Sequence, residues 1–430
     1  MGRIFYLDAV NGNDENSGIT PDAALKSLEA ANQILFGAGD KLLLKCGCEW
    51  KGMLCPHGDG DRFQFAQIGT YGDGEAPLID GNGAYAAILL DGVSYWKVKG
   101  LRICNHSSER CVRQGICISA KSEGITAGIE ISDCEIFEVD GENRRAMPVY
   151  QSMYWNGAVY VTFPGRTSAQ DHLHDIIISN NYIHDVRTSG IRVNQQEDFI
   201  NDIHHTHVVV RGNRIERTGS DGIIVANCIS PLIDSNICFD AVALGTLEDT
   251  QLIAGIWVCA TRDALIQRNE VARTRMFEND GTAFDTDWGT EGTTVFQYNY
   301  SHDNEGGFWL DCMKLNHNRD CEKTILRYNI SMRDGRCIAV YDQGILTEWY
   351  GNLFFHEKPI QICCFDEGEN FHFDHNVFCI PQETDWQKAR YEENIVNESQ
   401  WLELIQYETQ NPNWRDHVTE KLCKFVGVTR

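Results

Sequence analysis

Short stretches in which apolar residues alternate with other residues recur along most of this chain. A small residue is followed by an apolar-x-apolar triplet at residues 190–193, 222–225, 255–258, 307–310 and 337–340. A period of two is the pattern of a β-strand with one buried and one exposed face, whereas an amphipathic helix repeats every three or four residues. The pattern therefore predicts a chain built from many short strands.

A second phrase, polar-Asn-x-apolar, repeats between these strands. Its asparagines are spaced 23 to 33 residues apart, at Asn181, Asn213, Asn236, Asn269, Asn299, Asn329, Asn352 and Asn376. A unit of this length cannot bury its own apolar face, so successive units must stack as the coils of a parallel solenoid. Asparagine side chains stacked at one turn can hydrogen-bond along the stack, and asparagine tolerates the left-handed backbone of such turns. We interpret the repeated asparagines as structural.

Both ends of the chain lack the repeat and predict protective caps. Residues 21–35 carry Ala and Leu at helical spacing with Ser27 placed as an N-cap, so residues 1–60 are expected to hold a first strand and a short capping helix. The solenoid is expected over residues 61–380. Residues 381–430 are charged and amphipathic, and we expect them to cap the other end.

The net charge and the cysteine content limit the classes of binding partner and the cellular locations that we expect. The 430 residues include 37 Lys and Arg and 62 Asp and Glu, which gives a net charge of −25. This charge argues against nucleic acid or an anionic membrane as a partner and favours a neutral ligand. The 17 cysteines are scattered, and no apolar run has the length of a signal peptide or a membrane span. We expect a cytoplasmic protein, or a secreted one if a leader has been removed, and leave oligomerisation open.

Two parts of the sequence resemble known families. YLDAVNGNDENSG near the N-terminus and the later IGTYGDGEAPLIDG resemble bacterial right-handed parallel β-helix proteins of the pectate-lyase-like superfamily. Residues 280–312, DGTAFDTDWGTEGTTVFQYNYSHDNEGGFWLDC, resemble carbohydrate-active members of that group, among them β-helix glycoside hydrolases of the β-xylosidase kind. The resemblance implies an all-β, right-handed parallel β-helix and carbohydrate chemistry. Because the group holds hydrolases, lyases, epimerases and adhesins, the fold alone assigns no activity.

Alignment of the strands by their apolar residues predicts an acidic cluster on one exposed face. The residues expected to face inward are Ile191, Ile223, Ile256, Phe284, Phe308, Ile338 and Ile360. One outward column then reads Arg192, Ile224, Trp257, Asp285, Trp309 and Ala339, and the next reads Asn194, Ala226, Cys259, Asp287, Asp311 and Tyr341. Adjacent coils lie about 4.8 Å apart and alternate residues of a strand about 6.6 Å apart. Asp285, Asp287 and Asp311 are therefore predicted to lie close together.

Such a cluster fits acid–base chemistry on a sugar. Neighbouring carboxylates either raise the pKa of one member or bind a cation, and a glycosidase needs one protonated and one ionised carboxyl group. Aromatic side chains expected on the same patch would stack on sugar rings. The alternative is a solvated acidic face on an acidic protein. The candidate substrate-binding residues are Arg192, Asn194, Trp257, Trp288, His302, Trp309 and Tyr341.

Glu305 and Asp311 are the candidate partners of Asp285 and Asp287. Glu305 precedes Gly306 and Gly307, which would let the backbone bring it over the aspartates. The resemblance to the xylosidases implies an Asp paired with a Glu slightly more than twenty residues later, and Glu305 follows Asp285 by 20. The equal alternative is a solvated turn residue, with Asp311 as the acid instead. His302 is expected either to hydrogen-bond one of these carboxylates or to be an ordinary turn histidine.

Three functions follow, and the sequence leaves them open. The first is a retaining glycoside hydrolase, with Asp285 or Asp287 as nucleophile and Glu305 or Asp311 as acid. The ladder neighbours Asp287 and Asp311 fit the separation of about 5 to 5.5 Å that retention needs. The second is a polysaccharide lyase or uronate epimerase that uses Ca²⁺, which the net charge disfavours. The third is a carbohydrate-binding β-helix without chemistry.

No resident metal or cofactor is expected from the remaining clusters. Cys46, Cys48 and Cys55 provide one ligand too few for a structural zinc site. The histidines at 204, 205 and 207 precede an apolar run and fit a turn better than a metal site. Ca²⁺ would enter only under the lyase hypothesis.

Overall fold

The structure, a computed structural model, describes most of the chain. The described residues are 2–143, 155–163, 168, 170–195, 203–245, 253–276, 280–312, 321–341, 346–364, 370–386, 389–406 and 413–427. They form two compact units, one of residues 1–228 with 242–250 and the other of residues 229–241 with 251–430. Each unit is a stack of coils.

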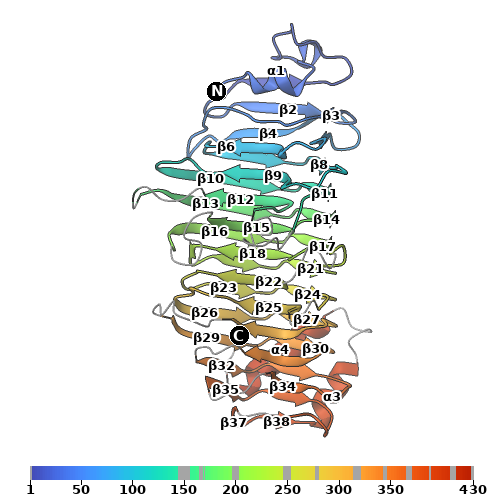
Figure 1. Ribbon diagram of the computed structural model, residues 1–430, viewed down its shortest axis with the longest axis vertical. Helices are drawn as coiled ribbons and strands as arrows, with labels where there is room; N and C mark the ends of the chain where they lie inside the picture. Colours follow the sequence, from blue (N-terminus) through green and yellow to red (C-terminus); the bar gives the residue numbers. More distant parts are fainter. Residues whose placement is uncertain are drawn as a thin grey trace. The chain divides into compact units, whose positions relative to one another are not determined.

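In the first unit every coil contributes strands to parallel sheets that we call I, II and III (Figure 1). Sheet I contains β1 (Ile4–Leu7), β2 (Lys41–Lys45), β4 (Ala66–Tyr71), β7 (Trp96–Lys99), β10 (Ile125–Ser132), β13 (His172–Ser179) and β16 (His205–Arg211). Sheet II contains β3 (Glu49–Lys51), β5 (Leu78–Asp80), β8 (Arg102–Asn105), β11 (Glu135–Val139), β14 (Tyr182–Val186) and β17 (Arg214–Thr218). Sheet III contains β6 (Ala86–Asp91), β9 (Gln114–Ser119), β12 (Val159–Phe163), β15 (Ile191–Gln195) and β18 (Ile223–Ala226). The short β19 (Cys228–Ile229) pairs with β16 of sheet I.

The second unit repeats the arrangement. Its sheet I contains β20 (Leu232–Asp234), β23 (Leu265–Gln267), β26 (Gly292–Gln297), β29 (Cys321–Arg327), β32 (Thr347–Tyr350), β35 (Phe371–Asp374) and β37 (Arg390–Glu392). Sheet II contains β21 (Ile237–Phe239), β24 (Glu270–Ala272), β27 (Tyr300–His302), β30 (Ile330–Met332), β33 (Leu353–Phe355), β36 (Val377–Cys379) and β38 (Ile395–Val396). Sheet III contains β22 (Ala254–Cys259), β25 (Thr282–Thr286), β28 (Gly307–Asp311), β31 (Cys337–Tyr341) and β34 (Gln361–Cys364). Since parallel crossovers are right-handed, the predicted all-β, right-handed parallel β-helix is confirmed.

The N-terminal segment forms the predicted helix, but the helix is short. The one-turn 3-10 helix η1 (Pro21–Ala23) precedes α1 (Leu28–Asn32). The Ser27 hydroxyl accepts a hydrogen bond of 3.1 Å from the backbone N–H of Ala30, as an N-cap does. Leu28 and Ala31 are buried, so this helix covers apolar surface at the start of the solenoid.

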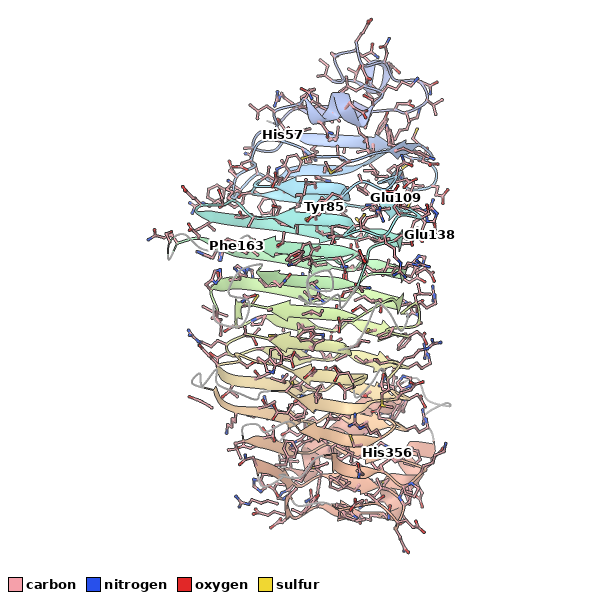
Figure 2. The ribbon with its side chains drawn as sticks, in the orientation of Figure 1. His57, Tyr85, Glu109, Glu138, Phe163 and His356 are labelled. Atoms are coloured by element: carbon pink, nitrogen blue, oxygen red, sulfur yellow. The ribbon has the colours of Figure 1, made fainter. Side chains whose placement is uncertain are left out.

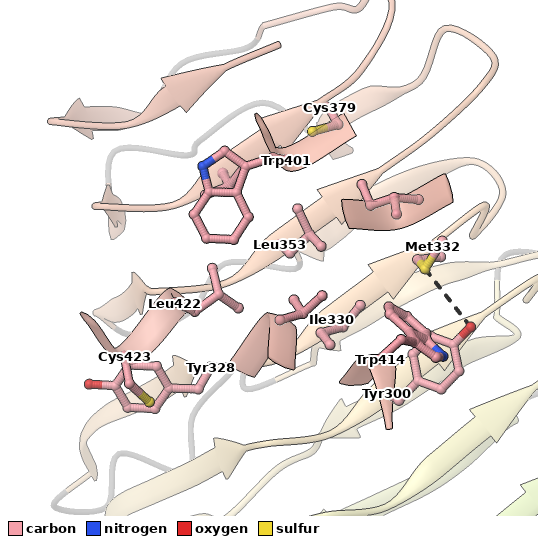
Figure 3. Close-up of a cluster of buried hydrophobic side chains, with 13 residues drawn as sticks. Tyr300, Tyr328, Ile330, Met332, Leu353, Cys379, Trp401, Trp414, Leu422 and Cys423 are labelled. Carbon is pink, nitrogen blue, oxygen red and sulfur yellow. Dashed lines mark hydrogen bonds between the residues drawn. The ribbon is translucent and has the colours of Figure 1, made fainter. Parts of the chain in front are cut away.

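The C-terminal segment both continues the coils and covers their side. After β37 and β38, the chain forms α3 (Ser399–Gln406) and α4 (Trp414–Phe425). Figure 3 shows Trp401, Trp414 and Leu422 from these helices among the apolar side chains that sheet II turns outward. The rings of Trp414 and Tyr300 meet edge to face with centroids 5.5 Å apart. The helices α3 and α4 therefore protect the outer face of sheet II, and the expected boundaries at 60 and 380 stay predictions.

The repeated asparagines form the predicted hydrogen-bonded ladder. In the second unit the backbone N–H of Asn299 donates to the side-chain oxygen of Asn329, and the N–H of Asn329 donates to that of Asn352, both at 3.0 Å. The ladder runs on to Asn394, past the end expected near residue 380. The left-handed residue is the one before each asparagine, such as Tyr298 with φ of +57°. The asparagine itself contributes its amide to the stack.

Candidate active site on sheet III of the second unit

Neighbouring strands of sheet III place Asp285 on the outer face of the second unit. Phe284 is in register with Ile256 and Trp309 and is fully buried against the ring of Phe296. Because successive side chains of a strand face opposite sides, Asp285 points outward. Its ladder neighbours are Trp257 on β22 and Leu310 on β28. The acid is 7% exposed and Trp257 is 5% exposed, so this part of the face is largely covered.

The predicted register is wrong by one residue from β28 onward. We expected Phe308 to lie beside Phe284, but Trp309 takes that place. At the corner before β28, Gly307 has φ of +115°, and both Phe308 and Trp309 turn into the core. A slip of one residue moves every later side chain of a strand to the other face.

Trp309 is consequently a core residue and not a sugar-stacking one. It is fully buried, with its ring centroid 5.4 Å from that of Trp349 and 6.4 Å from that of Phe296. The register shifts again at β34, where Ala339 pairs with Cys363, so Cys363 and not Ile360 continues the inward column of Phe284 and Trp309.

Asp311 does not lie beside Asp287. It is in register with Thr286, is 1% exposed, and shares the inward side of β28 with Trp309. The predicted outward position of Asp311, and with it the short Asp287–Asp311 pair, is therefore wrong. The predicted cluster of three exposed carboxylates reduces to two acids, of which Asp285 is buried and Asp287 is half-buried.

Asp287 and Trp288 form the turn that ends β25. The N–H of Asp287 donates to the carbonyl of Val258 at 2.8 Å, and the carbonyl of Trp288 accepts from the N–H of Ala260 at 2.7 Å. Both residues are half-buried. Two residues of extended chain span roughly 6.6 Å, so Asp285 and Asp287 remain neighbours at this end of β25.

Glu305 lies away from the two aspartates. It is exposed, and its carboxylate accepts a hydrogen bond of 2.8 Å from the N–H of Met276. It precedes β28, and the N–H of its neighbour Gly306 donates to the carbonyl of Gly281 before β25, whereas Asp285 pairs with Leu310 near the other end of these strands. A side chain at Gly306 would come within 2.3 Å of the carbonyl carbon of Gly281. That glycine permits close coil stacking, and the expected swing over the aspartates is wrong.

His302 bonds carboxylates other than the predicted ones. It lies on β27 of sheet II, where its ring nitrogens approach Asp303 at 2.7 Å and Glu270 at 3.5 Å. Burial lowers the pKa of His302, but these two carboxylates outweigh burial and raise the pKa above its usual value. His302 thus belongs to the sheet that α4 covers.

Arg192 and Asn194 lie on β15 of the first unit and are buried rather than exposed. The Arg192 guanidinium is 3.4 Å from the carboxylate of Asp221 and is fully buried. Asn194 is in register with Thr162 and is 1% exposed. Their predicted exposure is wrong. Tyr341 ends β31 in register with Asp311, and its side chain lies outside the described residues.

The sequence reasoning missed the apolar residues that flank Asp285. Leu310 and, on the next strand, Val340 continue its outward column in place of Trp309 and Ala339. The double glycine before β28 was the available signal for the shift in register. Asp285 therefore lies between Trp257 and Leu310 on the neighbouring strands, and Asp287, two residues later, is more exposed. Among the described residues, no group of three His, Cys, Asp or Glu side chains is placed to hold a metal ion.

These features define a class, a parallel β-helix protein with two aspartates at one end of a sheet III strand. The chain is similar to a lacto-N-biosidase of Bifidobacterium longum subsp. longum, with 26% identity over 474 residues that cover 88% of this chain and 29% of that protein. The chain thus spans less than a third of that relative's length. No family model matches the chain.

Two solved structures share the fold. The GH136 lacto-N-biosidase from Eubacterium ramulus has a TM-score of 0.70 and 22% identity, over 92% of this chain and 68% of that chain. A rhamnogalacturonan lyase has a TM-score of 0.56 and 14% identity, over 82% of this chain and 87% of that chain. Within the described ranges, no helix is both long and apolar enough to cross a membrane.

Proposed function

We propose that this protein is a glycoside hydrolase acting on an oligosaccharide, with Asp285 and Asp287 as its catalytic acids. The observation that carries the proposal is the pairing of Asp285 with Trp257, with Asp287 two residues further on in the turn that ends β25. Likeness to lacto-N-biosidases along most of the chain supports this reaction class.

The surroundings of the two aspartates suit a division of roles. Asp285 lies between Trp257 and Leu310, whereas Asp287 is in a turn and more exposed. Glycosidases depend on such unequal environments, because one carboxyl must hold a proton while the other is ionised. Two residues of extended chain span roughly 6.6 Å, which exceeds the separation of about 5 to 5.5 Å that retention needs. The retaining course expected from the Asp287–Asp311 pair therefore does not carry over to Asp285 and Asp287, and the anomeric configuration of the first product decides the course. We propose a lacto-N-bioside as the substrate, in place of the xyloside suggested by the sequence resemblance, because the similar proteins are lacto-N-biosidases.

The test compares wild-type protein with Asp285→Asn and Asp287→Asn on p-nitrophenyl lacto-N-bioside and p-nitrophenyl xyloside. We expect cleavage of the lacto-N-bioside, and a fall in kcat/KM of at least about 100-fold in each variant. Glu305→Gln is the matched control, since it alters an exposed acid that lies before β28 and accepts from the N–H of Met276, and it should keep the activity. Proton NMR of the first product gives the anomeric configuration.

Three other outcomes would contradict this proposal or favour another function. Full activity in both aspartate variants would remove them from the mechanism. Unsaturated products from uronate polymers, formed only with Ca²⁺, would favour the lyase or epimerase hypothesis. Saturable binding without cleavage of any glycoside would favour the carbohydrate-binding hypothesis.

A further inference from the structure

A cavity of about 390 Å³ lies at the corner between sheets II and III of the second unit. It is lined by the turns that follow β27, β30 and β33, including Asp303, Arg333, Arg336, His356 and Lys358. This volume is within the range of small-molecule sites, and it is many times the volume of about 30 Å³ that one water occupies. The cavity precedes β31, whereas the column of Asp285 crosses that strand at Val340, four residues after Arg336. The cavity lining contains neither Asp285 nor Asp287, so the cavity is distinct from the acid pair.

His356 is the unusual member of this lining (Figure 2). Its side chain is 4% exposed, and neither ring nitrogen has a hydrogen-bond partner of good geometry among the described residues. Burial and the nearby Arg333 lower the pKa of His356 to about 4, against an opposing backbone contact with Asp334, so the ring is neutral near pH 7. A neutral imidazole carries one donor and one acceptor. Buried polar atoms are normally hydrogen-bonded, so both nitrogens are suited to a ligand with hydroxyl groups.

The acidic residues at this corner are already engaged. The carboxylate of Asp334 is buried, and it accepts hydrogen bonds from Ser301 and Ser331 at 2.6 and 2.7 Å and from Asn304 at 2.8 Å. Asp303 pairs with Arg333 at 3.0 Å. These bonds satisfy both carboxylates within the fold, so neither needs a ligand from the cavity.

Cationic groups at the cavity belong to two successive turns. Arg333 and Arg336 come from the turn before β31, and Lys358 comes from the turn before β34. Lys358 is exposed and has no ion-pair partner within the described ranges, while Glu357 beside it is the remaining exposed acid of the lining. Arginine and lysine are the usual partners of carboxylates. The lining holds three cationic and three acidic side chains. Asp303 pairs with Arg333, and Asp334 is hydrogen-bonded within the fold, so Glu357 is the acid that remains beside Lys358 and Arg336.

We propose that this cavity binds a polyhydroxy carboxylate of about monosaccharide size, a sugar acid. Its carboxylate lies toward Lys358 and Arg336, and its hydroxyl groups bond the two nitrogens of His356. The site does not depend on the hydrolase activity, because it shares no residue with the acid pair.

The experiment measures binding of galacturonate to the full chain by isothermal titration calorimetry, with galactose and sodium sulfate as the comparison ligands. We expect saturable binding of galacturonate and none of galactose. Lys358→Gln and His356→Phe should each weaken binding at least about tenfold. Lys424→Gln, which alters an exposed lysine of α4, should leave binding unchanged.

The outcomes separate this site from its alternatives. Equal affinity for galacturonate and galactose, or binding unaffected by both cavity variants, would overturn the proposal. Sulfate bound as tightly as galacturonate would overturn the assignment to a sugar acid in favour of an inorganic anion. Circular dichroism checks the fold of His356→Phe, and Lys358→Gln tests the site at an exposed position if that variant unfolds. Asp285→Asn should retain galacturonate binding, so failure of the hydrolase proposal and failure of this one are distinguishable.

Discussion

At the scale of single residues, the asparagine ladder shows how one side chain can stabilise several coils. Asn329 is fully buried and forms a hydrogen bond with each of its neighbours in the stack, Asn299 and Asn352. Its amide also donates to the carbonyl of Phe296 at 3.0 Å. These bonds satisfy backbone groups that a tight turn would otherwise leave buried without partners.

Replacement of Asn329 by alanine should destabilise the protein by about 3 kcal/mol. The change leaves a backbone N–H and a carbonyl buried without their partners, and each such group costs about 1 to 3 kcal/mol. Urea denaturation measures the free energy of unfolding. Asn11→Ala is the control, since Asn11 is exposed and its amide makes one long bond of 3.3 Å to Asp8. A loss below about 0.5 kcal/mol in Asn329→Ala would contradict the structural role of the ladder.

At the scale of elements, register decided which sequence predictions succeeded. The ladder was predictable because one residue type recurs at one turn, and stacking depends only on that recurrence. Asp285 was also placed correctly outward, since β22 and β25 align without an insertion. Asp311 and Trp309 were misplaced because a corner with Gly307 in a left-handed conformation admits one more inward residue. Alternation by itself does not reveal where a strand enters its sheet. The cavity at His356 was equally hidden, because it is formed by turns from separate coils.

Ion pairs link α4 to sheet II, and their contribution to stability can be tested. Glu270 on β24 lies between His302 on β27 and Arg415 on α4, with an Arg415–Glu270 distance of 2.6 Å. These partners lower the pKa of Glu270 against the effect of burial, and Glu270 with Asp303 raises the pKa of His302.

His302→Asn should therefore destabilise the protein more at pH 6 than at pH 9. A histidine whose pKa is raised by folding stabilises fully below the usual value of 6.5, and this stabilisation is lost as the pH rises through the folded-state pKa. We expect a difference of about 1 to 2 kcal/mol between the two conditions, measured by urea denaturation. His57→Asn, at an exposed histidine, should show almost none. An effect of His302→Asn that is independent of pH would mean that packing, and not charge, is lost.

At the scale of the whole molecule, stability in a solenoid is approximately the sum of terms within coils and between adjacent coils. Each unit has its own layers of buried side chains. In the first unit, Ile103 on β8 is fully buried and in register with Ile79 and Ile136. In the second unit, Leu353 on β33 is fully buried against residues of the C-terminal helices. A substitution in the core of one unit should therefore lower the stability of nearby coils only.

Hydrogen exchange followed by mass spectrometry tests this expectation with a reciprocal pair of variants. Ile103→Ala should cost about 2 to 5 kcal/mol, because it leaves a cavity between coils, and protection should fall in β5, β8, β11 and the strands beside them. Protection in β30, β33 and β36 should stay at the wild-type level. Leu353→Ala should give the reverse pattern. If either variant lowered protection evenly in both units, the chain would unfold as one cooperative body, and nearest-neighbour additivity would not describe it. Localised losses would instead mean that substitutions in the first unit can be made without altering the acid pair or the cavity of the second.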